Sequence, residues 1–480
     1  MGSGTVAYAS RAGRGLVVAT TLGSGMVLLD STVVNVALRT IGSDLDASLA
    51  QLQWISNAYL LTLASLILLG GSLGDRLGRR RVFLVGVVWF AVASALCGLA
   101  PNAETLIAAR ALQGVGGALL APGSLAIIES GIAPADRGRA IGAWTGLTSI
   151  AAAIGPFVGG ALVQYADWRW IFWINAPLAA VTVAVTVAFV PESRTAETGR
   201  YDGLGAGLAA LTLGGLTYWL IEWHSDLALP ALVVGIVAGV CFVLVERRSS
   251  HPMLPLGLFA SRTFSAANAM TLLVYAALGA VLFFLVIDVQ TVLGYGALEA
   301  GMATLPITIL MLLLASRGGA LGTRIGPRIP MTVGPLVMAV GVAWLSFVDD
   351  GTSYWLGVLP PLCVFALGLA LLVAPLTATV LGAAPADRAG LASGVNNAVA
   401  RAGSLFAVAA LPVVVGLSGA EYDDAQVFSS AYARAMWVCA ALLAAGGVLS
   451  WFTIPEQVPA GPVDLRPGSA PQLDCPHRGH

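Results

Sequence analysis

The feature that most constrains this chain is a series of long apolar runs that fill most of its 480 residues. Charged residues make up only 10% of the sequence, whereas about 25% is usual for a soluble domain. A run of ~20 apolar residues is long enough to cross a bilayer as a helix. Such runs begin near Leu16, Gln51, Val82, Glu104, Arg139, Trp170, Asp202, Leu227, Phe264, Gly301, Met331, Tyr354, Ala389 and Ser430. The sequence therefore predicts an all-α integral membrane protein with fourteen transmembrane helices.

The charges between the runs predict the topology. Every second connection is rich in arginine: Arg11 and Arg14; Arg76 to Arg81; Arg137 and Arg139; Arg194 and Arg200; Arg247, Arg248 and Arg262; Arg324 and Arg328; and Arg388. The connections between them carry GSDLD, HSD, VDDG and AEYDD instead. Arginine gathers on the cytoplasmic side of a membrane. Both termini are therefore predicted to be cytoplasmic.

Two sequence motifs each occur twice, once in each half of the chain. GSLGDRLGRRR at 71–81 returns as GALGTRIGPRI at 319–329, 248 positions later, and APADRGRAIG at 133 returns as APADRAGLASG at 384, 251 positions later. Parallel halves related by an axis along the membrane normal are a transporter architecture, with the substrate site between them. We expect two six-helix bundles in a pseudo-twofold relation at 1–192 and 263–455, two inserted helices with their flanking loops at 193–262, and a disordered cytoplasmic tail at 456–480.

The first of these repeated motifs, at 71–81, also points to a function. Its glycines permit a tight turn and a close approach of helices, and its acid and arginines can form a charge cluster that breaks and re-forms between two states. Arginines that only fix the topology would explain neither the acid nor the spaced glycines. We interpret the segment as a conformational latch, with these residues: Gly71, Asp75, Arg76, Gly78, Arg79 and Arg80.

The pattern Gly-x-Leu-x-Asp-Arg-x-Gly-Arg-Arg at 71–80 resembles the signature loop of the major facilitator superfamily. Fourteen spans, two of them inserted centrally, are similar to the drug:proton antiporter branch of that family, the multidrug-resistance type exporters. The resemblance covers roughly residues 16 to 455. It implies the major facilitator fold, a bacterial cell membrane (the inner or plasma membrane) and transport by alternating access.

Two charges in the first half are predicted to meet inside the membrane. Asp30 and Arg110 lie at about 12 and 9 Å from the outer ends of their runs, at 1.5 Å per residue. An arginine in hydrocarbon is costly and needs a partner. Arg110 shares one helix face with Gln113. The resemblance implies that the fourth-span arginine belongs to the proton-coupling machinery, and that Asp30 and Asn35 lie in a first-span pattern typical of the fourteen-span branch, which departs from the family at Arg39.

The fifth run contains AAAIGPFVGG, in which glycines four residues apart form a small-residue stripe. Close helix packing explains such a stripe in general. The corresponding segment of the second half, ARAGSLFAVA, lacks the Gly-Pro element. The resemblance implies that this motif marks antiporters, and the residues concerned are Gly155, Pro156, Gly159 and Gly160.

Other polar and aromatic residues in the runs are candidates for the substrate cavity. Arg401 lies near the middle of its span, has no acid at equal depth in its own half, and would pair across the cavity or bind an anionic group. Asp288 is a candidate for selecting cations, although it lies close enough to a span end to reach the interface instead. The expected cavity residues are Asn35, Trp54, Tyr59, Gln113, Asp288, Asn396 and Arg401.

Taken together, these features predict a secondary active transporter that exports lipophilic, drug-like or metabolite substrates in exchange for protons. Asp30 would carry the proton, because a low-dielectric site favours the neutral form of a carboxyl group. A dedicated exporter of an endogenous metabolite or lipid, and a proton-independent facilitator, are the alternatives. Because the sequence offers no catalytic constellation, phosphate loop or metal-spaced cluster, we expect no enzyme activity, cofactor, metal or nucleic-acid partner. We expect a monomer whose partners are the bilayer, protons and a small molecule.

Overall fold

The computed structural model describes residues 5–194, 202–249, 252–349, 351–385, 388–417 and 424–456. The expected tail lies outside the described residues except for Glu456. The described residues form helices and one isolated β-bridge between Val6 and Ile132. Fourteen helical segments are long and apolar enough to cross a membrane. The predicted fold class and number of spans are confirmed.

The first half forms a bundle of six spans, here called the N-terminal bundle. Its helices are α1 (Arg11–Leu45), α2 (Leu49–Leu77), α3 (Arg79–Gly98), α4 (Ala103–Gly131), α5 (Arg137–Tyr165, preceded by the short turn η1, Pro134–Asp136), α6 (Trp170–Trp173) and α7 (Asn175–Phe189). Side-chain caps fix several starts: Ser48 forms a capping box with Gln51 at α2, and Asn102 accepts from Thr105 at α4. Within the bundle, α1 packs against α5 and α7, and α4 packs against α2 and α3.

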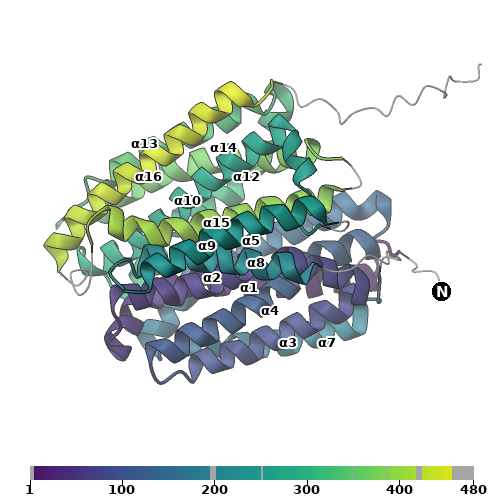
Figure 1. The fold of residues 1–480 in the computed structure, drawn as a ribbon, viewed down its shortest axis with the longest axis horizontal. Coiled ribbons are helices and arrows are strands. Elements are labelled where there is room, and N and C mark those ends of the chain that lie inside the picture. Colours follow the sequence, from purple (N-terminus) through teal and green to yellow (C-terminus); the bar gives the residue numbers. More distant parts are fainter. Residues whose placement is uncertain are drawn as a thin grey trace, which may run out of the picture.

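The second half forms the C-terminal bundle, which lies beside the first (Figure 1). Its helices are α10 (Arg262–Thr291, after η2, Leu256–Ala260), α11 (Ala297–Ala303), α12 (Leu305–Ile325), α13 (Arg328–Leu345), α14 (Leu359–Gly382, after η3, Tyr354–Val358), α15 (Ala389–Val414) and α16 (Ala425–Thr453). Here α10 packs against α15 and α16, and α14 packs against α12 and α13.

The backbone repeats itself at the spacing of the first repeated motif. Gly78 separates α2 from α3 with φ 110°, and Gly326, 248 positions later, separates α12 from α13 with φ 82°. Glycine has no Cβ and therefore adopts a positive φ without the steric strain that other residues would meet. A Cβ on Gly70 would lie 2.0 Å from the carbonyl of Ala118, and one on Gly318 would lie 2.2 Å from the carbonyl of Ala370. The contact between α2 and α4 in the first half therefore recurs between α12 and α14 in the second half.

The two inserted helices are α8 (Gly203–Ile221) and α9 (Ala228–Arg248). They pack against each other, and α8 contacts both bundles. In particular, α8 contacts α2 of the N-terminal bundle and α15 of the C-terminal bundle. Figure 1 shows the teal pair running along the boundary between the two groups of helices. The pair thus covers one side of the seam between α2 and α15.

The molecule has an arginine-rich end, which carries the loop Asp75–Arg81, and an opposite end, where α1 finishes and α2 begins. Hydrogen bonds join the bundles at the opposite end. Gln53 Nε2 donates to the carbonyl of Val408 (2.7 Å), and Gln290 Nε2 donates to the carbonyl of Val36 (3.0 Å). The Arg39 guanidinium in turn donates to the carbonyl of Gln290. These contacts hold α1 to α10 and α2 to α15, so the opposite end is closed.

Candidate functional site

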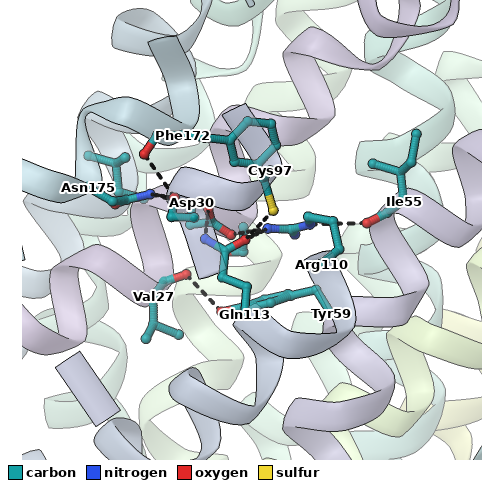
Figure 2. Close-up of polar contacts among 12 residues, drawn as sticks. Val27, Asp30, Ile55, Tyr59, Cys97, Arg110, Gln113, Phe172 and Asn175 are labelled. Atoms are coloured by element: carbon teal, nitrogen blue, oxygen red, sulfur yellow. Dashed lines mark hydrogen bonds and ion pairs between the residues drawn. The ribbon is translucent and has the colours of Figure 1, made fainter. Parts of the chain in front are cut away.

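A buried ion pair between α1 and α4 forms the centre of the candidate site. Arg110 Nη1 lies 2.5 Å from Asp30 Oδ2, and the exposed fractions of the two residues are 1% and 0%. Figure 2 shows the pair surrounded by labelled residues of α2 (Ile55 and Tyr59), α3 (Cys97), α6 (Phe172) and α7 (Asn175). The depth argument from the sequence therefore placed these two residues together correctly.

Neutral groups complete the environment of this pair. Gln113 Nε2 donates to Asp30 Oδ1 (2.7 Å), and Gln113 Oε1 accepts from Arg110 Nη1 (2.6 Å). Arg110 Nε also donates to the carbonyl of Ile55 on α2 (3.1 Å). Gln113 thus closes a triangle with both charges, as its position three residues after Arg110 on one helix face predicts.

Aromatic rings cover the guanidinium. Its central carbon lies 4.4 Å from the centroid of the Tyr59 ring and 5.9 Å from that of Phe172. Such cation–π contacts stabilise a desolvated arginine. The Tyr59 hydroxyl donates to the carbonyl of Val27 on α1 (3.4 Å), as Figure 2 shows. Tyr59, which we expected in the substrate cavity, is therefore part of the wall around the ion pair.

Three residues of this network were not predicted from the sequence. Asn175 Nδ2 reaches Asp30 Oδ1 (3.5 Å) and donates to Ser94 Oγ (3.0 Å), and the thiol of Cys97 contacts Gln113 Oε1 at 3.6 Å. All three are fully buried. The available signal was a polar residue within an apolar run, with Asn175 the clearest instance because buried amides need hydrogen-bond partners.

The hydrogen bonds around Asp30 all point toward its carboxyl oxygens. Both of its oxygens accept from donors: Arg110 on one side, Gln113 and Asn175 on the other. An ionised carboxylate only accepts, whereas a protonated one also donates. This arrangement fits the ionised form. A buried pair of this kind pays a large desolvation cost, so removing either partner leaves an uncompensated charge.

The glycines at 155–160 connect this site to the C-terminal bundle. A Cβ on Gly155 would lie 2.1 Å from Thr32 Oγ1, and one on Gly159 would lie 2.7 Å from a methyl group of Val33. Both contacts are on α1, within three residues of Asp30. On the other face, a Cβ on Gly160 would lie 2.6 Å from the carbonyl oxygen of Ala297.

Pro156 extends the contact between α5 and α11. Its carbonyl oxygen lies 2.1 Å from the position of a Cβ on Gly301, so the two backbones touch without side chains between them. Small residues permit this closeness between membrane helices. As a result α5 is clamped between α1, which carries Asp30, and α11 of the other bundle.

The predicted latch is a charge cluster within the N-terminal bundle. Arg79 pairs with Asp75 (2.7 Å), and its Nη1 donates to the carbonyl of Ala126 on α4 (3.3 Å). Arg80 Nη2 donates to the carbonyl of Val187 on α7 (3.0 Å), and Arg81 lies 3.6 Å from Glu192. Gly71 packs against Pro122 of α4. The described contacts therefore tie the α2–α3 turn to α4 and α7, and its role as a latch stays a prediction.

A match to the Major Facilitator Superfamily model extends over residues 20–408, across the buried pair, both repeated motifs and most of the C-terminal bundle. The chain belongs to the major facilitator superfamily. It is 36% identical over 404 residues to the multidrug resistance protein Stp of Mycobacterium tuberculosis strain CDC 1551, a match covering 83% of this chain and 75% of Stp. It is 35% identical to the tetracenomycin C resistance and export protein of Streptomyces glaucescens, again covering 83% and 75%.

Solved structures of the superfamily share the fold at low sequence identity. A peptide transporter, POT, in complex with sulfate has a TM-score of 0.67 at 16% identity, with 93% of this chain and 98% of that chain covered. The inward open form of the xylose transporter XylE from E. coli has a TM-score of 0.63 at 16% identity, with 92% and 96% covered. The protein is therefore a multi-pass membrane transporter of this superfamily and not an enzyme.

Within this superfamily fold, Arg401 lies where the bundles face each other. It is partly buried on α15, and its charge acts on Tyr59 of the N-terminal bundle and Tyr275 of α10. In the part of the chain that the structure describes, no carboxylate lies within ion-pair distance of it. Five residues before it on α15, Asn396 Nδ2 donates to Thr271 Oγ1 of α10 (2.7 Å) and to Asn268. Asn35 is partly buried on α1.

Two expected cavity residues have other neighbours in this structure, and their place in a substrate cavity stays a prediction. Trp54 faces the inserted pair: its indole N–H donates to Glu222 (3.1 Å), and its ring lies 6.1 Å from that of Tyr218 on α8. Asp288 is fully buried within the C-terminal bundle. The sequence did not distinguish these faces, because helices such as α2 and α10 pack against several neighbours at once. Among the described residues, no group of three or more His, Cys, Asp or Glu could hold a metal ion.

Proposed function

We propose that this transporter exports lipophilic, drug-like or metabolite molecules in exchange for protons by alternating access. The observation that carries the proposal is the ionised Asp30 held by Arg110 in a form closed at the opposite end. With the arginine-rich end in the cytoplasm, the closed end is the outer one, and we assign this form to the inward-facing half of the transport cycle. It has already released its proton and is ready to accept cargo from the cell.

Asp30 is suited to carry the proton because the interactions that its neighbours make with it depend on its charge. When Asp30 is ionised, Arg110, Gln113 and Asn175 all stabilise it. When it is protonated, the ion pair is lost, and Arg110 retains the carbonyl of Ile55, the oxygen of Gln113 and the rings of Tyr59 and Phe172. Two arrangements of one network, selected by one proton, are what alternating access needs.

The motif on α5 carries this change to the other bundle. Because Gly155 and Gly159 touch α1 near Asp30 while Gly160 touches α11, a movement of α1 is transmitted directly to the contact between the bundles. The packing is too close for α1 and α5 to slide independently. This continuity supports antiport, in which protonation and the opening of one end are coupled.

Arg401 indicates the chemistry of the cargo. An arginine without a carboxylate partner at the bundle interface is costly, and an anionic or zwitterionic cargo would provide the missing charge. Relatives named for multidrug resistance and for tetracenomycin C export fit an exporter of small organic molecules. A dedicated metabolite or lipid exporter and a proton-independent facilitator are the alternatives that the experiment separates.

Purified protein in liposomes with a pH-sensitive dye inside, under an imposed proton gradient, tests the proposal. A panel of lipophilic anions, zwitterions and cations is added to wild type, Asp30→Asn and Asp46→Asn. Asp46 is an exposed residue with φ 50° at the end of the same helix, a conformation that asparagine also adopts. We expect a compound that triggers proton movement in wild type and Asp46→Asn but not in Asp30→Asn. Cargo movement without protons in wild type would leave a facilitator.

A further inference from the structure

The C-terminal bundle contains a buried carboxyl group whose environment is the reverse of that of Asp30. Asp288 lies on α10, three residues before the helix ends at Thr291, and has an exposed fraction of 0%. Among the described residues, neither of its carboxyl oxygens has a hydrogen-bond partner. The hydroxyl of Tyr432, on the neighbouring helix α16, is also buried and without a partner among these residues. Two unused polar groups therefore lie on packed helices inside an apolar bundle.

Among the described residues, no positive charge forms an ion pair with Asp288. The charged or titratable groups on the elements packed against α10 are Tyr432, Arg434 and Cys439 on α16, Arg401 on α15, Glu299 on α11, Cys363 on α14, and Arg11, Arg14, Asp30, Arg39 and Asp44 on α1. Arg39 donates to the carbonyl of Gln290, and Arg434 is exposed and donates to its own helix at Ser430. None of the described ion pairs includes Asp288.

An isolated buried carboxylate is strongly disfavoured and takes up a proton instead. We propose that Asp288 is a second proton-binding site, separate from the Asp30 network, in which a neutral carboxylic acid is buried without a compensating charge. Asp30 is surrounded by donors in the same structure, so the two halves offer a carboxyl group opposite environments. The proton comes from bulk water and returns to it, and no covalent bond other than O–H changes.

The position of Asp288 connects this proton to the closed end. Two residues further along α10, Gln290 makes both hydrogen bonds that hold α10 to α1, one through its side chain and one through its carbonyl. Ionised Asp288 needs water, which only an opened end of α10 admits. Protonation of Asp288 therefore favours the closed form, and its ionisation favours opening. This link to transport rests on the proposed function, whereas the protonation of Asp288 does not.

Infrared spectroscopy of the full chain in lipid nanodiscs tests the protonation directly. We expect wild type at neutral pH to show the carbonyl band of a protonated carboxylic acid, lost in Asp288→Asn and retained in Asp30→Asn. An unchanged band in Asp288→Asn would overturn the proposal. Asp288→Leu provides a second test. Because leucine would replace a group that is already neutral, we expect this variant to fold into a monodisperse protein. Misfolding of the Leu variant, together with an unchanged band in the Asn variant, would show that Asp288 is ionised.

Spin labels on the two bundles test the link to the closed end. Ser43 on α1 and Trp355 on η3 are exposed at that end. With cysteines at these two positions in a background without other cysteines, we expect alkaline pH to lengthen the distance in wild type and in Asp30→Asn but not in Asp288→Asn. An equal lengthening in Asp288→Asn would overturn the link. Loss of the infrared band in Asp288→Asn, together with unchanged proton transport in Asp30→Asn, would keep the second site and reject the proposed function.

Discussion

At the scale of single residues, the same side chain, aspartate, is placed in two environments with opposite consequences. Asp30 accepts from an arginine and two amides, whereas Asp288 has no donor among the residues that the structure describes. Burial alone penalises the charge of both groups, so the donors distinguish them. The stability of the Asp30 network should therefore respond to the removal of a single donor.

Gln113→Leu removes the amide that donates to Asp30 Oδ1 and accepts from Arg110. Loss of a hydrogen bond to a charged group should cost about 1.5–3 kcal/mol of stability. Thermal unfolding of the variant and of wild type in the same detergent measures this loss. A variant as stable as wild type would contradict the account.

Arg110→Gln should destabilise the protein more than the double variant Asp30→Asn with Arg110→Gln. The single variant leaves a buried carboxylate without its cation, which costs about 3–5 kcal/mol when it stays ionised. The double variant leaves two neutral amides that can bond to each other and to Gln113. Unfolding of the two proteins in the same detergent, compared with wild type, measures the difference. Equal losses in both would show that the charges are not coupled.

At the scale of helices, the sequence predicted a contact that depends on depth but gave no information on the rotation of each helix. Asp30 and Arg110 were paired because each lies at a countable distance from its helix end. Trp54 and Asp288 were expected in the cavity, which stays a prediction; Trp54 bonds to Glu222, Asp288 is buried in the C-terminal bundle, and Asn175 was missed. These helices pack against several neighbours at once, so the sequence alone does not tell which neighbour a polar residue meets.

Gly160→Ala on α5 should disfavour the form closed at the opposite end. Its new Cβ would lie 2.6 Å from both the carbonyl oxygen of Ala297 and the Cα of Leu298, backbone atoms that cannot move aside alone. Gly146→Ala is a matched control on the same helix, because nothing lies within 4 Å of its Cβ position. The backbone N–H of Leu298 donates a hydrogen bond to Gln164 Oε1 (3.0 Å) in the closed form. Cross-linking between cysteines placed at these two positions therefore reports closure. Equal yields in the two variants would show that the contact does not control closure.

At the scale of the whole molecule, the transporter consists of two related bundles whose polar contents differ. The N-terminal bundle holds a compensated ion pair, and the C-terminal bundle holds a neutral acid and, at the interface, Arg401. The repeated glycines at 78 and 326 show how closely the backbones correspond despite this. Two similar frameworks with different charges allow one to carry the proton while the other contacts cargo.

Arg401→Gln should weaken the transport of anionic cargo and spare neutral cargo. A charged hydrogen bond is worth about 1.5–3 kcal/mol, and ~1.4 kcal/mol corresponds to a tenfold change in affinity. We therefore expect the concentration for half-maximal transport of an anionic compound to rise by about tenfold or more. Arg434→Gln, an exposed arginine that donates only to its own helix, is the control. An equal effect on anionic and neutral compounds would place Arg401 outside the cargo site.

The central claim is that Asp30 couples the proton to the cargo, and the most direct test is the number of protons released when a transported compound binds. Calorimetric titration in buffers of different ionisation enthalpy gives this number for the purified protein. The account predicts proton release in wild type that grows as the pH falls and Asp30 becomes protonated, and a loss of that release in Asp30→Asn. Equal release in both proteins would contradict it, because the proton displaced by cargo would then come from another residue.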